Sequence, residues 1–307
     1  MRLDFVKLPN QLFYGKGERE SYIKECNDFN IIITIIYLYS SNNYYGDSVF
    51  TIEDLIYFCG YKSVSRKQGE NLDKMRNLLQ YMIDKELIYC DVDVMKVKST
   101  KVIKCKTNFF DYEDDEEEHY EYGFVKIPVS IIDKLLAYDG KEDKIKLLFY
   151  WSYIHCRRYK KQKDSYREVR ESCTWVSFDK INYDLGLSRY TIDTYNNILV
   201  ELGLLLIHNS GYLVKGKEVK NCNNIYVTID EDLETAEMYM KESINRYEYK
   251  RRQEGYKINK RSSEEKKEKK KRKVQEELKI QNPRNVGLEA EQEKEAEITN
   301  YLDGLFG

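Results

Sequence analysis

The chain has 307 residues, of which 41% are hydrophobic and 34% charged, with a formal net charge of −2. This length allows two cores of ordinary domain size, and the absence of a long apolar run argues against a transmembrane helix. Seven scattered cysteines without CxxC spacing, and opening residues that do not resemble a signal peptide, predict a cytoplasmic protein with reduced thiols.

A pentapeptide occurs twice and predicts a duplicated module. The run FVKLP at 5–9 returns as FVKIP at 124–128, and a similar order of predicted elements follows each copy. Internal similarity of this kind indicates a repeated architecture. We therefore expect module 1 over residues 1–110 and module 2 over residues 123–232, each entered through the pentapeptide as a strand or turn of its core.

Module 1 is predicted to contain three helices followed by a pair of strands that turns near residue 99. Thr51 and Asp54 resemble a capping box at the start of the second helix, and Gly60 ends that helix. A polar loop separates it from the third helix. The predicted helices cover 30–40, 52–60 and 71–85, and the predicted strands cover 87–96 and 101–110.

An acidic stretch is predicted to link the two modules. Residues 111–122 contain eight Asp and Glu and no Lys or Arg. A segment of this composition cannot bury enough apolar surface to fold, so a solvated linker is the favoured interpretation. DNA mimicry and loose metal binding are the alternatives.

Module 2 repeats the same order. Ser177 is a predicted N-cap, residues 186–188 form the turn between two helices, and Gly203 ends the second of them. Residues 209–211 read Asn-Ser-Gly, which predicts a hairpin turn. The predicted helices cover 129–138, 142–156, 177–185 and 189–202, and the predicted strands cover 204–208, 212–214 and 224–229. This order predicts a winged helix.

Beyond residue 232 the sequence predicts a helical segment and then a tail. An apolar stripe at helical spacing begins at Leu233 and ends at Tyr247, and it is expected to pack on module 2 or on a partner. The rest of the segment over 233–282 is basic and predicted to be helical, and an acidic tail covers 283–307. The predicted class is therefore α+β, mainly helical, with tandem winged helices and a charged helical and disordered C-terminal tail.

The helix over 189–202 is the predicted DNA-reading element. A winged helix lays this helix in the major groove, where Arg can contact guanine and Asn can contact adenine. Asp193 opposes this role because it repels phosphate, and an ordinary solvated helix face is the alternative. The candidate residues on its outward face are Ser188, Arg189, Tyr190, Thr194 and Asn197.

Basic residues elsewhere are candidates for phosphate contacts, which add salt-dependent affinity without sequence preference. A solvated loop is the alternative for the segment over 157–170. Module 1 could instead serve for dimerisation or bind a second half-site. In module 2 the candidates in the segment over 157–170 are Arg157, Arg158, Lys160, Lys161 and Lys163. In module 1 the candidates are Lys62, Ser65, Arg66, Lys67 and Lys74.

The motifs of common enzymes are missing from the sequence. The run Gly15-Lys16-Gly17 lacks the frame of a phosphate-binding loop, and the three histidines form neither HxH nor HExxH. We therefore expect no catalytic activity, no metal and no cofactor.

The last residues suggest a short linear motif. Leu302, Leu305 and Phe306 resemble the leucine-phenylalanine peptides that dock on bacterial sliding clamps, although the leading Gln of those peptides is missing. A few apolar anchors on a disordered tether suffice for such binding. A frayed terminus without a partner is the alternative.

The pentapeptide at 124–128, the apolar helix after it and the segment over 177–207 resemble the N-terminal winged-helix domain of replication initiators from Gram-positive plasmids and phages. The resemblance covers most of residues 1–230 as two copies. It implies binding of double-stranded origin DNA, commonly as a homodimer, and recruitment of host replication proteins, with no membrane partner. A transcriptional regulator with the same fold and a protein-interaction adaptor are the alternatives.

Overall fold

The structure, a computed structural model, is of the α+β class and combines helices with small antiparallel sheets. Contacts divide the chain into two compact units: unit 1 with residues 1–209 and 223–247, and unit 2 with residues 210–222 and 248–307. Module 1 and most of module 2 therefore lie in one unit, and the predicted boundary near residue 110 does not separate two compact bodies. The described residues are 4–15, 20–43, 47–60, 68–109, 123–161, 168–170, 173–230 and 232–260.

Module 1 contains the predicted helices and strands, although the first strand after the long helix ends at residue 90 instead of 96. A short helix over 22–26 and a strand over 47–50 were not predicted. Thr51 and Asp54 form the predicted capping box, because Thr51 accepts from the Asp54 backbone N–H and the Asp54 carboxylate accepts from the Thr51 N–H. The elements are β1 (Phe5–Pro9), η1 (Asn10–Leu12), α1 (Tyr22–Cys26), α2 (Asn30–Ser40), β2 (Asp47–Phe50), α3 (Ile52–Phe58), α4 (Gln68–Asp84), β3 (Ile88–Cys90) and β4 (Ile103–Thr107).

Module 2 and the residues after it form the second half of the chain. The elements of module 2 are β5 (Phe124–Pro128), α5 (Val129–Leu136), α6 (Lys144–Cys156), β6 (Tyr159–Lys161), β7 (Glu168–Arg170), β8 (Thr174–Val176), α7 (Phe178–Leu185), α8 (Arg189–Glu201), β9 (Leu205–His208), β10 (Tyr212–Lys215), β11 (Glu218–Asn221) and β12 (Asn224–Thr228). They are followed by α9 (Leu233–Gln253) and β13 (Lys257–Asn259).

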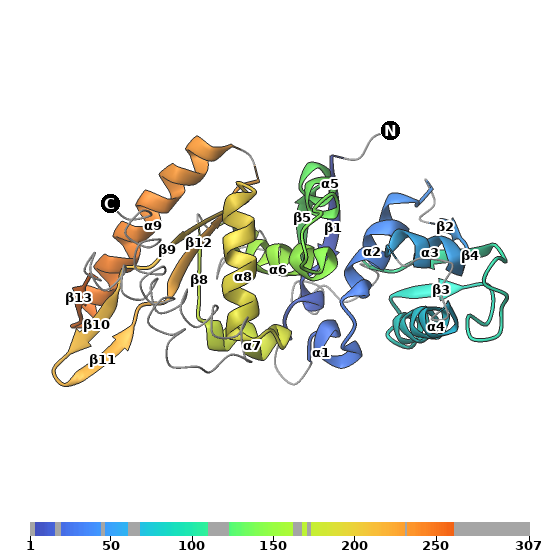
Figure 1. Ribbon diagram of the computed structural model, residues 1–307, viewed down its shortest axis with the longest axis horizontal. Helices are drawn as coiled ribbons and strands as arrows, with labels where there is room; N and C mark the ends of the chain where they lie inside the picture. The colour runs from blue at the N-terminus through green and yellow to red at the C-terminus, as the bar shows by residue number, and fades with distance from the viewer. Residues whose placement is uncertain are drawn as a thin grey trace, which may run out of the picture. The chain divides into compact units, whose positions relative to one another are not determined.

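The two modules share one topology. In module 1 a strand precedes α3 and α4 and two strands follow them, and the antiparallel sheet has the order β2-β4-β3. In module 2 the same arrangement surrounds α7 and α8, and the sheet order is β8-β12-β9. In each sheet the last strand along the chain lies between the other two (Figure 1).

The two copies of the pentapeptide pair with each other. Strands β1 and β5 are antiparallel and lie side by side (Figure 1), with Lys7 opposite Lys126 at the centre of the register. The Lys7 ammonium lies 4.6 Å from the centre of the Phe124 ring, and the Lys126 ammonium lies 4.5 Å from the centre of the Phe5 ring. Like charges directly opposite destabilise a strand pair, and each cation here gains an aromatic partner on the other strand.

Because the register is centred on equivalent lysines, each copy of the pentapeptide makes the same contacts with the other. Val6, Leu8, Val125 and Ile127 alternate with the lysines and are buried. This period of two places these four side chains on the face that covers the core. The repeat therefore forms the joint between the two modules, which the sequence analysis did not predict.

One hydrophobic core runs through both modules. It includes residues from β1 and α2 in module 1 and from α6 and α8 in module 2. Phe149 on α6 is fully buried, and its ring centre lies 5.1 Å from that of Phe13 and 5.1 Å from that of Phe29. Helix α6 is buried along nearly its whole length because it serves both modules.

The predicted hairpin around residues 209–211 is wrong. Strand β9 pairs with β12, and β10 pairs with β11. The Asn209 side chain donates to Asn224 at the start of β12, 2.7 Å away, so the chain leaves β9 there without folding back on it. The hairpin lies between β10 and β11 instead, where Gly216 has a φ of 60°.

The segment after residue 232 is helical as predicted at first and then departs from the prediction. Ala236, Met240 and Tyr247 of α9 are buried, and Tyr247 contacts Trp175 of β8 edge to face at 5.2 Å. Leu233 is exposed and does not belong to the buried stripe. The start of the predicted basic helix is wrong, because residues 257–259 form β13 and pair with β10.

Candidate nucleic-acid interface

A capped turn positions α8. Gly186 ends α7 with a φ of 68°, a left-handed conformation that favours glycine, and Leu187 is buried in the turn. The Asn182 side chain donates to the Leu187 carbonyl oxygen at 2.9 Å and closes the turn. Ser188 is the N-cap of α8, and its Oγ accepts from the Thr191 backbone N–H at 3.1 Å.

Helix α8 has a buried face and an exposed face. Ile192, Tyr195 and Leu199 pack in the core, and Asn196 accepts from the buried Tyr150 hydroxyl at 2.7 Å. Burial keeps Tyr150 neutral, because its pKa is raised well above its ordinary value. The core contacts therefore fix the orientation of the helix and of the side chains on its other face.

The exposed face of α8 contains most of the predicted DNA-reading residues. Arg189, Tyr190 and Asn197 are exposed, and Asp193 lies among them. Ser188 is also exposed, but its hydroxyl forms the helix cap. The Thr194 hydroxyl is half-buried and donates to the Tyr190 carbonyl oxygen at 3.0 Å. Arg189, Tyr190 and Asn197 are thus the side chains best placed to contact a ligand.

A surface ion pair orients Arg189. Its Nη2 lies 2.7 Å from Asp179 Oδ1 on α7, and both side chains are more than two-thirds exposed. The hydrogen bond with Asp179 raises the pKa of Arg189, which remains a cation. Exposed pairs of this kind contribute little to stability. A base edge or a phosphate can therefore replace Asp179 as the partner of Arg189.

The structure corrects the prediction that Arg157 and Arg158 belong to a phosphate-binding loop. Arg158 is fully buried, and its Nη1 donates to the carbonyl oxygen of Thr228 at 2.8 Å and to its hydroxyl at 2.6 Å. The Arg157 side chain is only 22% exposed and is bound to Asp184 at 2.5 Å. The Arg158 guanidinium is therefore not available to phosphate, and that of Arg157 is mostly buried against Asp184.

The remainder of the predicted basic loop contains a second hairpin. The backbone of β6, with Lys160 and Lys161, pairs with β7 in an antiparallel ladder. Lys163 lies outside the described residues. The phosphate contacts predicted for Lys160, Lys161 and Lys163 therefore stay predictions.

In module 1 the structure describes one of the predicted contacts. Lys74 lies on α4, is half-exposed and forms an ion pair with Glu70 at 2.8 Å. The other candidates of module 1, Lys62, Ser65, Arg66 and Lys67, lie outside the described residues. The same is true of the predicted partner motif, with Leu302, Leu305 and Phe306.

Unit 2 contains basic residues that the sequence analysis missed. Lys215, Lys217 and Lys220 are exposed on and around the β10–β11 turn. Lys220 donates to the Tyr256 hydroxyl at 2.7 Å and to Glu218 at 3.1 Å, and the latter bond lowers the pKa of Glu218. The run Lys-Gly-Lys at 215–217 was the sequence signal for this turn, because glycine between polar residues favours one.

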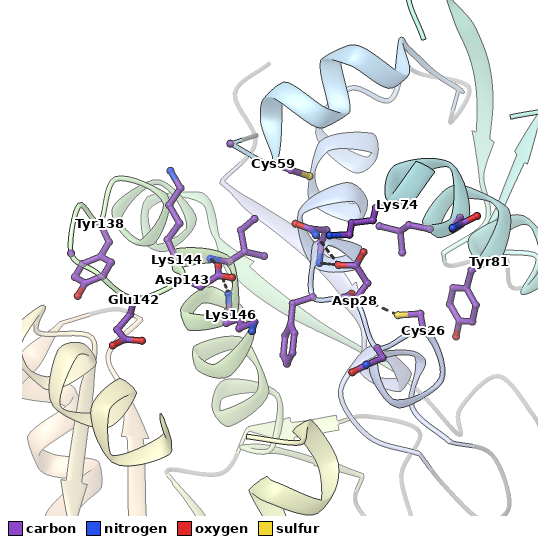
Figure 2. A pocket seen from close by; sticks show the side chains of 18 of the residues that line it. Cys26, Asp28, Cys59, Lys74, Tyr81, Tyr138, Glu142, Asp143, Lys144 and Lys146 are labelled. Atoms are coloured by element: carbon purple, nitrogen blue, oxygen red, sulfur yellow. Dashed lines mark hydrogen bonds between the residues drawn. The ribbon is translucent and has the colours of Figure 1, made fainter. Parts of the chain in front are cut away.

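A cleft of about 1140 Å³ lies between residues of the two modules (Figure 2). Its carboxylates serve local structure: Asp28 accepts from the Asn30 backbone N–H at 2.9 Å, and Asp143 caps α6 by accepting from the Ile145 N–H at 2.9 Å. Lys144 donates to the Leu136 carbonyl oxygen at 2.9 Å. These groups stabilise helix ends.

Within the described part of the chain, no three His, Cys, Asp or Glu side chains come together as a metal site. Likewise, none of the described helices is long and apolar enough to cross a membrane. Comparison with protein-family models, with curated proteins and with solved structures found no match for the chain. The candidate interface therefore depends on geometry and chemistry alone.

Proposed function

We propose that the chain binds double-stranded DNA sequence-specifically through α8. The observation that carries the proposal is the exposed face of α8, which bears Arg189, Tyr190 and Asn197 on a helix whose opposite face is fixed in the core. Its 13 residues correspond to a length of about 20 Å, and a helix of this diameter fits the major groove.

We further propose that each module is a winged helix. The strand order β2-β4-β3 in module 1 and β8-β12-β9 in module 2 supports this assignment, as does the pair of helices between the first and second strands of each sheet. In this fold the second helix of the pair reads the groove, and that helix is α4 in module 1 and α8 in module 2.

The chemistry of the exposed residues suits base edges. An arginine can donate two hydrogen bonds to guanine, and an asparagine can pair with adenine through its amide. Helix α8 has no cation besides Arg189, so the phosphate contacts must come from other elements. We assign them to Lys160 and Lys161 of the β6–β7 hairpin, which belongs to the same unit as α8.

The resemblance to plasmid and phage initiators leads us to propose initiation of replication as the biological role, through origin repeats and host replication proteins. Two modules in one compact unit support this role, because one chain then offers two candidate reading helices, α4 and α8. Selected sites that form repeats at an origin would agree with it. Sites that overlap a promoter would instead identify a transcriptional regulator.

Arg189→Ala is expected to reduce the preference for the selected site. Loss of a bidentate base contact reduces the preference over a mismatched duplex by roughly tenfold to a hundredfold, whereas weak binding to any duplex persists. Lys160→Ala is expected to weaken binding to all duplexes similarly and to reduce the salt slope by about one. Titrations of matched and mismatched duplexes by fluorescence anisotropy measure both effects.

Asp179→Ala is the matched control, because it removes the ion-pair partner of Arg189 and leaves the guanidinium in place. It is expected to retain the preference for the selected duplex. Equal effects of Arg189→Ala and Lys160→Ala on matched and mismatched duplexes would contradict the assigned roles. No binding of any duplex by the wild-type chain at low salt would leave the protein-interaction adaptor as the surviving hypothesis.

A further inference from the structure

Two cysteines lie directly opposite each other in the sheet of module 1. Cys90 of β3 is paired with Cys105 of β4 in the antiparallel register. The neighbouring pair is hydrogen-bonded, because the Asp91 N–H donates to the Lys104 carbonyl oxygen at 3.1 Å. Hydrogen-bonded and non-hydrogen-bonded pairs alternate along such a ladder, so Cys90 and Cys105 form a non-hydrogen-bonded pair.

This position suits a disulfide. Residues of a non-hydrogen-bonded pair have Cα atoms about 4.5 Å apart, with their side chains on the same face of the sheet. The Cα separations of disulfides begin at about 4.4 Å, so no movement of the strands is required. The two sulfurs are free thiols in the structure.

The two thiols differ in exposure and in pKa, and these differences indicate which of them reacts first with an oxidant. Cys90 is partly exposed and Cys105 is fully buried. The hydrogen bond from Cys105 lowers the pKa of Cys90, whereas that bond and burial raise the pKa of Cys105. Burial raises the pKa of Cys26 to about 11 and that of Cys59 to about 12. Cys90 therefore combines access with thiolate character, which governs reactivity towards oxidants.

We propose that Cys90 and Cys105 form a redox-responsive thiol pair that closes to a disulfide when a peroxide oxidises it. The Cys90 thiolate attacks one peroxide oxygen, the O–O bond breaks, and the departing hydroxide takes up a proton to become water. The Cys105 thiol then gives up its proton as its sulfur attacks the Cys90 sulfenic acid, the S–O bond breaks, and the departing hydroxide takes up that proton to leave as a second water. One peroxide is reduced to two waters while two thiols are oxidised to one disulfide.

The bond would join the two strands that follow α4 and close the loop between them. Closing a loop restricts the unfolded chain, so the oxidised sheet is expected to resist unfolding more than the reduced sheet. The pair does not depend on DNA binding, because both thiols point to the core side of the sheet and Lys104 and Lys106 occupy its exposed side.

The test is peptide mapping of the full chain after treatment with hydrogen peroxide, alkylation and digestion without reductant. Several lysines lie between the two cysteines, so trypsin separates them unless a disulfide joins their peptides. We expect the joined peptides to form, with the loss of two hydrogen atoms from the intact mass and reversal by dithiothreitol. The melting temperature of the oxidised chain is expected to rise.

Matched variants make the outcome decisive. Cys90→Ser is expected to abolish the joined peptides and the rise in melting temperature, whereas Cys26→Ser retains both. Cys105→Ser is expected to leave Cys90 as a sulfenic acid that dimedone traps. The proposal is overturned if wild-type Cys90 stays reduced, if it proceeds to sulfinic acid without the joined peptides, or if Cys26 reacts as fast as Cys90.

Discussion

Phe149→Ala is expected to destabilise the chain by about 3–5 kcal/mol and to uncouple the unfolding of the two modules. The Phe149 ring is fully buried on α6 of module 2, and it packs against Phe13 and Phe29 of module 1. Truncation removes apolar contact area and leaves a cavity where the modules meet. The shared core, of which this ring is a central part, is the physical reason for a single compact unit.

Urea unfolding followed by two probes measures this effect. Both tryptophans, Trp151 and Trp175, lie in module 2, so their fluorescence reports that module, whereas far-UV circular dichroism reports the helices of both. In the wild type the two curves are expected to coincide, and in Phe149→Ala they separate.

Leu199→Ala is the matched control because Leu199 is equally buried but lies on α8, inside module 2. It is expected to cost about 2–5 kcal/mol while the two curves stay together. Coincident curves for Phe149→Ala at the wild-type midpoint would show that the modules are not coupled through this ring.

Asp184→Ala is expected to cost about 2–3 kcal/mol of unfolding free energy. The carboxylate is buried and accepts from the Tyr153 hydroxyl at 2.7 Å, from Arg157 at 2.5 Å and from Lys180 at 2.8 Å. Burial raises the pKa of Tyr153, so its hydroxyl keeps its proton and would lose its acceptor in the variant. Breaking a fully buried pair costs more, about 3–5 kcal/mol, but Arg157 is partly exposed and can reach water.

Asp179→Ala provides the comparison on the same helix, because Asp179 is exposed and its pair with Arg189 is screened by solvent. Chemical denaturation of both variants is expected to shift the midpoint for Asp184→Ala and to leave it unchanged for Asp179→Ala. If the two variants had similar midpoints, the Asp184 carboxylate would not form its bonds to Tyr153 and Arg157 in solution.

Local signals in the sequence predicted the helices well. Ser177, the Thr51 capping box and Gly186 act within one turn of a helix, and the structure contains each of them as predicted. Helical periodicity also separated the buried and exposed residues of α8, since Ile192 is buried and Asn197 is exposed. These features depend on neighbours in the sequence, so a single sequence is enough to find them.

The same local signals could not predict which strands pair when they lie far apart in the sequence. The β1–β5 pair joins residues more than a hundred positions apart. Strands β9 and β12 pair although the β10–β11 hairpin lies between them along the chain. Arg157 and Arg158 belong to a basic run that the sequence alone assigns to solvent. Their partners, Asp184 and Thr228, lie far along the chain, so their burial follows only from the tertiary structure.

We propose above that the exposed face of α8 reads DNA sequence. The most direct measurement is the affinity of the full wild-type chain for a duplex selected from a random pool, compared with a shuffled duplex of the same composition at physiological salt. We expect a preference of roughly a thousandfold or more for the selected duplex, typical of specific binding. Equal affinity for the two duplexes, or failure to enrich any sequence, would contradict it.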